Sequence, residues 1–137
     1  MDEMTEFVLA FLCTVVCLAG VLWTGFRWRI KKRRKLHIGL VGSSVALLAW
    51  TILAALDLGE LYDLESAGTI YPVHMALAQL ATFSLLLPVV TGLITLRTGK
   101  SHRYHRMGAV ASFALILLAA ITGIWMINAA TPFPIVI

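Results

Sequence analysis

The stretch RWRIKKRRKLHIGLVGSSVALLAWTILAAL, residues 27–56, changes from a strongly basic segment to an uninterrupted apolar one. Seven Lys and Arg residues lie between Arg27 and Lys35, and no charged residue lies between Ile38 and Leu56. A run of about 20 apolar residues is long enough for an α-helix to cross the hydrocarbon core of a bilayer. The stretch therefore predicts a transmembrane helix that begins beside a basic loop.

Three further apolar runs bring the expected number of transmembrane helices to four. The runs are 7–26, 38–56, 71–96 and 107–127. None of them contains Lys, Arg, Asp or Glu, and 60% of the 137 residues are hydrophobic. Since backbone amides in lipid must be hydrogen-bonded within their own segment, the runs are expected to be α-helices. The predicted fold class is an all-α, integral membrane four-helix transmembrane bundle that forms a single domain over residues 1–137.

The charged residues are segregated along the chain. All eleven Lys and Arg residues lie in 27–35 and 97–106, and all seven acidic residues lie in 2–6 and 57–65. Cytoplasmic loops of membrane proteins are enriched in Lys and Arg. We therefore expect a multi-pass protein of the cell inner membrane, with both basic loops against its anionic inner leaflet and both termini outside. This segregation accounts for the net charge of +4, and no nucleic-acid binding is expected.

Four histidines lie at or near the ends of the expected helices: His37, His74, His102 and His105. His37 and His105 begin the second and fourth helices on the same side of the membrane. Helix bundles hold cofactors between side chains of facing helices, and haem iron accepts histidine as an axial ligand. His37 and His105 are therefore the predicted ligands of haem b. Arg34 and Arg106 are predicted to bind its propionates.

His74 lies about one turn into the third helix, on the opposite side of the membrane. An ionisable residue within a membrane span is a functional candidate by default. It is expected either to ligate copper or another metal ion, with Met75 or the acidic outer loop, or to hydrogen-bond a neighbouring helix. The hydrogen bond is slightly favoured. His102, in the inner loop, is expected to be solvated.

Other residues within the helices are interpreted as structural. Small and hydroxyl side chains let the backbones of neighbouring helices approach one another. Pro88 lacks an amide hydrogen, so it should bend the third helix and free the carbonyl of Ser84. Cys13 and Cys17 lie one helical turn apart, and they are expected to pack as small apolar side chains rather than to bind metal.

Three of the histidines stand in short sequence patterns. His74 begins a His-x-x-Leu-Ala pattern within YPVHMALAQL. His105, within KSHRYHRMGAVASFALILLAAITGIWM, is followed seventeen residues later by the pair Thr122–Gly123. With His37, each of the last three expected helices carries a histidine. Over residues 30–127 this arrangement resembles the bacterial four-span membrane family called domain of unknown function 420.

The resemblance implies a haem- or metal-binding membrane protein of the respiratory chain. That family resembles the wider group of four-helix b-type cytochromes and is associated with respiratory oxidases. Two features of this chain depart from the family. Val41 stands where the family usually has a methionine, and the stretch between His74 and His105 is longer.

Two main functions are open at this point. The first is a b-type cytochrome-like protein that transfers electrons, with quinone or a larger respiratory complex as partner; it predicts a red, low-spin haem protein. The alternative is a non-catalytic accessory or assembly subunit of a terminal oxidase or other respiratory complex, in which histidines pack or handle metal transiently. Transport ranks third, because no charged residue lies within the spans. A stand-alone enzyme is not favoured, and a homodimer is open.

Overall fold

The computed structural model describes residues 3–26, 32–99 and 102–133, without the side chains of residues 3, 25, 26, 32–34 and 102. Within these ranges, four helical segments are long and apolar enough to cross a membrane: Met4–Thr24, Lys35–Gly59, Ile70–Thr98 and Arg103–Ala129. The all-α fold class is thus confirmed. The length and composition of the four segments are those of a multi-pass membrane protein. The single domain expected from the sequence stays a prediction, because the chain divides into two compact units.

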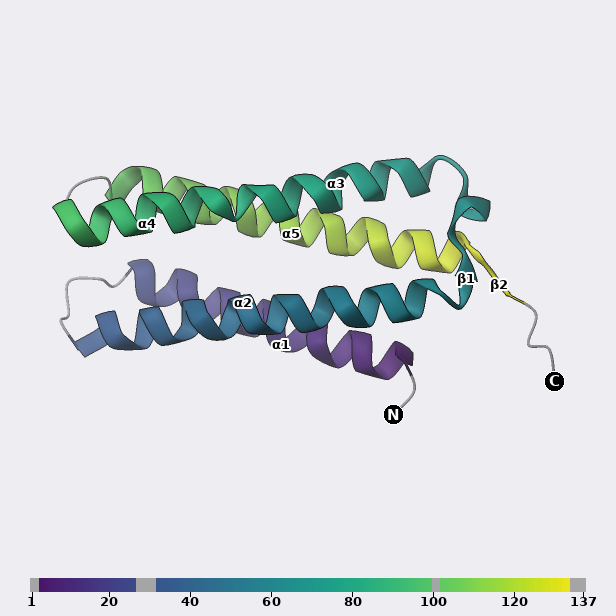
Figure 1. The fold of residues 1–137 in the computed structure, drawn as a ribbon, viewed down its shortest axis with the longest axis horizontal. Helices are drawn as coiled ribbons and strands as arrows, with labels where there is room; N and C mark the ends of the chain where they lie inside the picture. The colour runs from purple at the N-terminus through teal and green to yellow at the C-terminus, as the bar shows by residue number, and fades with distance from the viewer. Residues whose placement is uncertain (1–2, 27–31, 100–101, 134–137) are drawn as a thin grey trace. The chain divides into compact units, whose positions relative to one another are not determined.

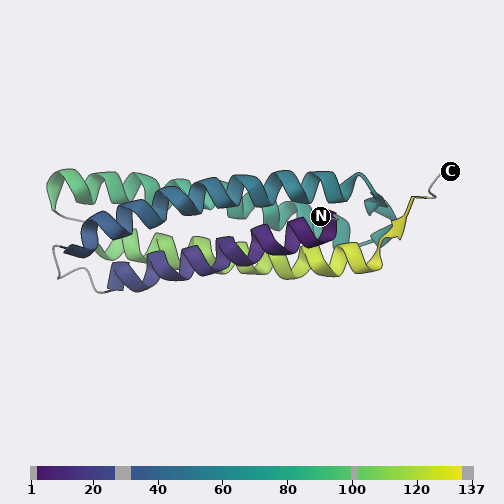
Figure 2. The same ribbon diagram turned by 90° about the horizontal axis from the view of Figure 1, so that it is seen from below.

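The first unit, Met1–Leu61, is a hairpin of two antiparallel helices (Figures 1 and 2). Helix α1 spans Glu3–Phe26 and helix α2 spans Lys32–Gly59. Both helices extend beyond the predicted apolar runs, because an α-helix can continue past the hydrocarbon core into polar residues. The apolar run therefore predicts each helix but not where it ends.

Polar side chains join α1 and α2 along the hairpin. Thr14 Oγ1 lies 2.8 Å from Thr51 Oγ1, and Trp50 Nε1 donates to Glu6 Oε1 over 3.0 Å. Polar groups in an apolar surrounding gain from pairing across a helix contact. The side of α1 that carries Thr14 therefore faces the side of α2 that carries Thr51.

The second unit, Tyr62–Ile137, contains three longer helices. Helix α3 spans Ile70–Ser84, α4 spans Leu86–Thr98 and α5 spans His102–Ala129. Helix α5 runs antiparallel to α3 and α4 and packs against both of them (Figure 1). Gly99 follows the last residue of α4 and caps it, because its φ of 67° is left-handed and its amide donates to Thr95 O over 2.9 Å. Glycine adopts this conformation without steric cost, which is why it commonly ends helices.

The third predicted span is divided into α3 and α4 at Leu85. Pro88 has no amide hydrogen to donate to the carbonyl of Ser84, four residues earlier. Ser112 Oγ of α5 donates to that carbonyl oxygen instead, over 2.8 Å. The freed carbonyl predicted at Ser84 is therefore confirmed, and a facing helix satisfies it.

A short antiparallel pair of strands ties the two ends of the second unit together. Strand β1, Tyr62–Asp63, pairs with β2, Thr131–Pro132. Ser66 Oγ, in the short helix η1 (Leu64–Ala67), accepts hydrogen bonds from the amide of Thr131 over 2.8 Å and from its hydroxyl over 3.0 Å. The sequence did not predict this pairing, because it rests on contacts between distant residues.

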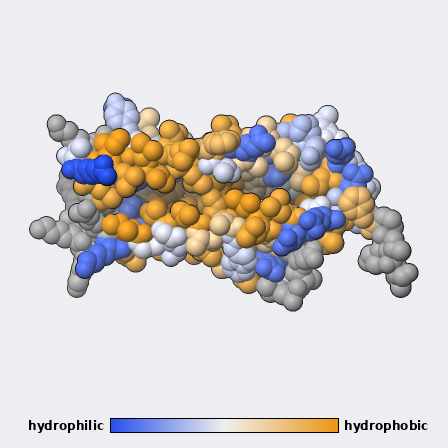
Figure 3. Space-filling model, in the orientation of Figure 1, coloured by the Kyte–Doolittle hydropathy of each residue, from blue (hydrophilic) through white to orange (hydrophobic). Residues whose placement is uncertain are grey.

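Large apolar side chains face outward from the helices. Figure 3 shows hydrophobic surface over most of the helix lengths on the face in view. Val16 is 71% exposed and Phe83 is 68% exposed, whereas the largest fully buried side chains among the described residues are Thr14 and Ser112. Soluble proteins bury their large apolar side chains. The opposite distribution here fits helices that are surrounded by lipid.

Candidate functional site

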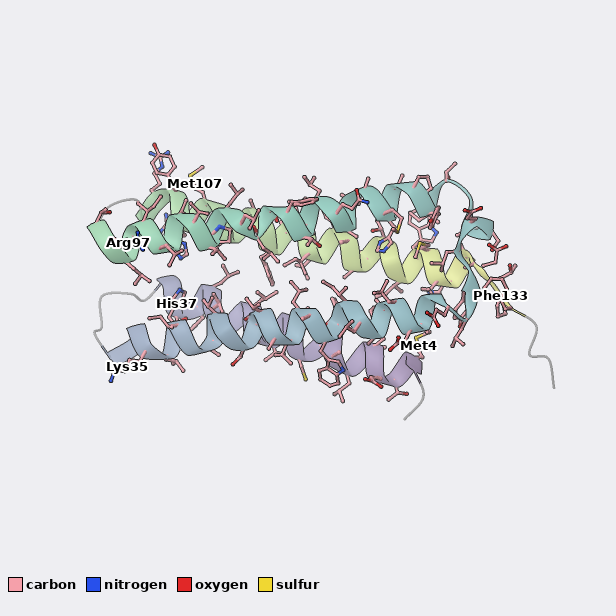
Figure 4. The ribbon with its side chains drawn as sticks, viewed as in Figure 1. Met4, Lys35, His37, Arg97, Met107 and Phe133 are labelled. Atoms are coloured by element: carbon pink, nitrogen blue, oxygen red, sulfur yellow. The ribbon has the colours of Figure 1, made fainter. Side chains whose placement is uncertain are left out.

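His37 lies near the start of α2, at the end that carries Lys35 (Figure 4), and its side chain is buried. Its Nδ1 is 2.9 Å from Thr24 Oγ1 in α1. The Thr24 hydroxyl also reaches two carbonyl oxygens of its own helix, Gly20 O at 2.9 Å and Val21 O at 3.0 Å. When the hydroxyl donates to either carbonyl, its oxygen accepts the Nδ1 hydrogen of His37.

His105 lies near the start of α5 and bonds the backbone of α4. Its Nδ1 donates to Pro88 O over 2.9 Å. A carbonyl oxygen can only accept, so Nδ1 carries the hydrogen and Nε2 carries the lone pair of the neutral ring. Gly92 makes room for this contact, since a Cβ at that position would lie 3.1 Å from His105 Cε1.

His74 lies in the first turns of α3 and bonds the backbone of α5. Its Nδ1 is 3.0 Å from Ala119 O and 3.2 Å from Thr122 Oγ1. The ring packs against Gly123, where a Cβ would lie only 2.9 Å from His74 Cε1. The predicted hydrogen bond to a neighbouring helix is confirmed. The acceptor oxygen of Ala119 again assigns the hydrogen to Nδ1.

The predicted ligand pair is divided between the two units. His37 belongs to the first unit and His105 to the second, and each is held within its own unit. Arg106 follows His105 in α5 and has an exposed side chain. Arg34 lies in α2 three residues before His37, and its side chain, like that of His102, falls outside the described part of the chain.

In the described residues, no group of three or more His, Cys, Asp or Glu side chains is placed to hold a metal ion. The copper site considered for His74 with the acidic outer residues therefore has no support from the geometry. Cys13 and Cys17 are free thiols, and Cys17 Sγ donates to Leu40 O of α2 over 3.4 Å. A haem with two axial histidines needs only two protein ligands, so it does not depend on such a group.

The residues that hold the histidines were only partly identified from the sequence. Thr24 was missed, and Gly92 was interpreted only as a small residue at a helix contact. A partial signal was present, because three of the four Thr-Gly pairs, 24–25, 91–92 and 122–123, lie on a helix that contacts a histidine, whereas the fourth, Thr98–Gly99, lies at the end of α4.

Comparison of the chain with protein-family models, with curated proteins and with solved structures gives no match. The family resemblance drawn from the short histidine motifs therefore stays a prediction. The case for a function rests on the residues and their geometry.

Proposed function

We propose that this chain is a membrane-embedded b-type cytochrome-like protein, which binds haem b through His37 and His105 and serves electron transfer in a respiratory chain. The observation that carries the proposal is the hydrogen bond that each of these two imidazoles makes through Nδ1. Each uses Nδ1 to bond an oxygen of the neighbouring helix in its own unit. Metal-ligating histidines commonly bind the metal through one ring nitrogen and a protein oxygen through the other.

The donor set fits haem better than a bare metal ion. Two imidazoles would suffice to hold haem iron, and the haem would supply one-electron redox chemistry when bound. His37 and His105 would hold the iron, and the oxygens of Thr24 and Pro88 would fix the orientation of the two rings.

Cations near both histidines support the binding of the haem carboxylates. Arg34 precedes His37 by three residues, and Arg106 directly follows His105. Arginine binds carboxylates through charge-assisted hydrogen bonds, often with two parallel N–H groups. These two arginines would therefore bind the propionates at the end of the helices where the basic loops begin.

The same basic loops support a membrane orientation. We assign them to the cytoplasmic face of the cell inner membrane, next to anionic lipid, with both termini outside. Quinone or a larger respiratory complex would exchange electrons with the haem. A homodimer is compatible with the small residues on the helix surfaces.

Optical spectra of the purified protein test the proposal. After expression with sufficient haem, the wild-type protein should show a sharp low-spin band on dithionite reduction. His37→Ala and His105→Ala should both lose the band. His74→Ala is the matched control, because it also removes an imidazole bonded to a neighbouring helix, and it should keep the band. A colourless wild-type protein would contradict haem binding.

A non-catalytic accessory or assembly subunit of a terminal oxidase is the second candidate. It is favoured by the observation that each Nδ1 bond also joins two helices, as a purely structural histidine would. In this role His37, His74 and His105 would pack the helices or handle a metal ion transiently. A colourless protein that purifies together with a respiratory oxidase would support this function over electron transfer.

A further inference from the structure

The three histidines with described side chains share a local arrangement. Each ring lies against a helix that carries a Thr-Gly pair, and the pairs are Thr24–Gly25, Thr91–Gly92 and Thr122–Gly123. The pairs lie on three different helices, α1, α4 and α5. In each case the ring bonds through Nδ1. A fourth pair, Thr98–Gly99, ends α4 instead. The contacts at the three rings also differ, with Thr24 at His37, Gly92 at His105 and both members of the pair at His74.

The two sites in the second unit match in detail. The carbonyl that accepts from the ring lies four residues before the glycine that the ring covers, Pro88 before Gly92 and Ala119 before Gly123. Residues four apart lie on the same face of a helix. A ring bonded to the first carbonyl therefore lies over the position of the second residue, where a Cβ would be 2.9 Å from the ring at Gly123 and 3.1 Å from it at Gly92.

In the first unit, the oxygen at Nδ1 of the histidine belongs to a side-chain hydroxyl instead of a backbone carbonyl. At His37 the acceptor is the hydroxyl of Thr24, whose own hydrogen has two carbonyls of α1 within reach. At His74 the hydroxyl of Thr122 is a second oxygen beside the same Nδ1 as the Ala119 carbonyl. In all three sites an oxygen of a neighbouring helix lies within hydrogen-bond distance of Nδ1.

We propose that Thr24, Gly92 and Gly123 are positioning residues that hold His37, His105 and His74, respectively, as the tautomer with hydrogen on Nδ1. In free neutral histidine the hydrogen prefers Nε2, so the protein must select the other form. Nε2 is then the basic nitrogen of all three rings. At His74 and His105 a carbonyl acceptor assigns the hydrogen to Nδ1, and at His37 the assignment rests on the Thr24 hydroxyl donating to a carbonyl of its own helix. Binding of a metal centre by Nε2 rests on the proposed function.

The tautomers can be read from 15N chemical shifts of the protein labelled at histidine, in detergent and without haem. The measurement is made at alkaline pH, where imidazole is neutral. Replacing each histidine by Gln assigns the signals. The wild-type protein should show the Nδ1–H form at His37, His74 and His105. The Nε2–H form at any of these three would overturn the proposal for that ring.

Variants of Thr24 test whether the positioning residue selects the tautomer. Thr24→Val keeps the shape but removes the acceptor, so His37 should lose the Nδ1–H signature while His74 and His105 keep theirs. Thr24→Ser retains a hydroxyl and should restore the wild-type signal. An unchanged His37 in Thr24→Val, or the same loss in Thr24→Ser, would contradict selection by the hydroxyl.

Variants of the second unit provide a graded test. Gly123→Ala should displace the His74 ring and abolish its Nδ1–H signature, whereas Thr122→Val leaves the Ala119 carbonyl and should preserve it. Gly42→Ala is the matched control, because a Cβ at this helical glycine meets nothing within 4 Å. An intact His74 signature in Gly123→Ala, or loss of it in Thr122→Val or Gly42→Ala, would overturn the assignment.

These results are independent of haem. A colourless protein with three Nδ1–H histidines would contradict the proposed function and support the positioning residues. A protein that is red with haem but has Nε2–H histidines in its haem-free form would support the proposed function and contradict the positioning residues.

Discussion

The two compact units differ in the acceptors of most of their described interhelical hydrogen bonds, with Cys17 Sγ to Leu40 O and His74 Nδ1 to Thr122 Oγ1 as exceptions. In the first unit, Thr24 and His37 meet side chain to side chain, as do Thr14 and Thr51. In the second unit the side-chain donors of α3 and α5 bond backbone carbonyls, and the acceptors are Ala119, Pro88 and Ser84. A side-chain acceptor can be deleted by substitution, but a backbone carbonyl cannot. The two units should therefore respond differently to mutation.

The backbone acceptors of the second unit have identifiable origins. Pro88 releases the Ser84 carbonyl from the helix ladder. Glycines at 92 and 123 let an imidazole approach the helix surface closely enough to reach a carbonyl one turn earlier. In the second unit, each histidine hydrogen bond thus depends on the imidazole that donates and on the glycine that leaves space beside the acceptor carbonyl. In the first unit it depends on two side chains that must both be present.

The largest effect on stability is expected from Gly123→Ala. Its Cβ would lie 2.9 Å from His74 Cε1, so the ring or the helix must shift. Overpacking of this kind typically costs about 1–3 kcal/mol. The free energy of unfolding in mixed detergent micelles measures it. Gly42→Ala has open space and should be neutral or slightly stabilising, because alanine has the higher helix propensity. Equal destabilisation by both substitutions would contradict the close packing of His74.

Ser112→Ala should have the next largest effect. It removes the donor to the Ser84 carbonyl and leaves a buried acceptor without that partner, at a cost of about 1–2 kcal/mol. In a Pro88→Ala background the cost should fall, because residue 88 then offers its own amide to Ser84. A double-mutant cycle of unfolding free energies measures this coupling. Additive effects would show that the proline does not create the need for Ser112.

The smallest effects are expected in the first unit, from Thr14→Val and Thr51→Val. Interhelical hydrogen bonds in membranes average about 0.6 kcal/mol. Each hydroxyl also lies close to a carbonyl of its own helix, Ala10 O at 2.8 Å and Leu47 O at 2.9 Å, so the remaining partner stays satisfied. Unfolding titrations of the two single variants measure the loss. A cost as large as that of Ser112→Ala would contradict the contrast between the two units.

The spans and the helix break could be predicted because their causes are local. An apolar run of about 20 residues specifies a membrane helix by its own length, and a proline specifies a missing hydrogen bond four residues earlier. The oxygens that bond the histidines could not be predicted in this way. Which carbonyl faces His105, or that Thr24 faces His37, depends on the register between two helices, and this register is set by packing along their whole contact.

The pairing of Tyr62–Asp63 with Thr131–Pro132 was missed for the same reason. It joins residues at opposite ends of the second unit, and neither two-residue strand has a pattern that could be recognised alone. The Thr-Gly pairs were a readable signal at the histidine sites. That three of the four pairs lie on a helix that contacts a histidine became evident only from the structure.

Low-temperature EPR of the oxidised, purified protein is the most direct measurement of haem ligation by His37 and His105. Two axial imidazoles predict a low-spin ferric signal in the wild-type protein and in His74→Ala. This signal should be lost, or replaced by a high-spin one, in both His37→Ala and His105→Ala. A wild-type protein without ferric haem, or a low-spin signal that survives either substitution, would contradict ligation by this pair.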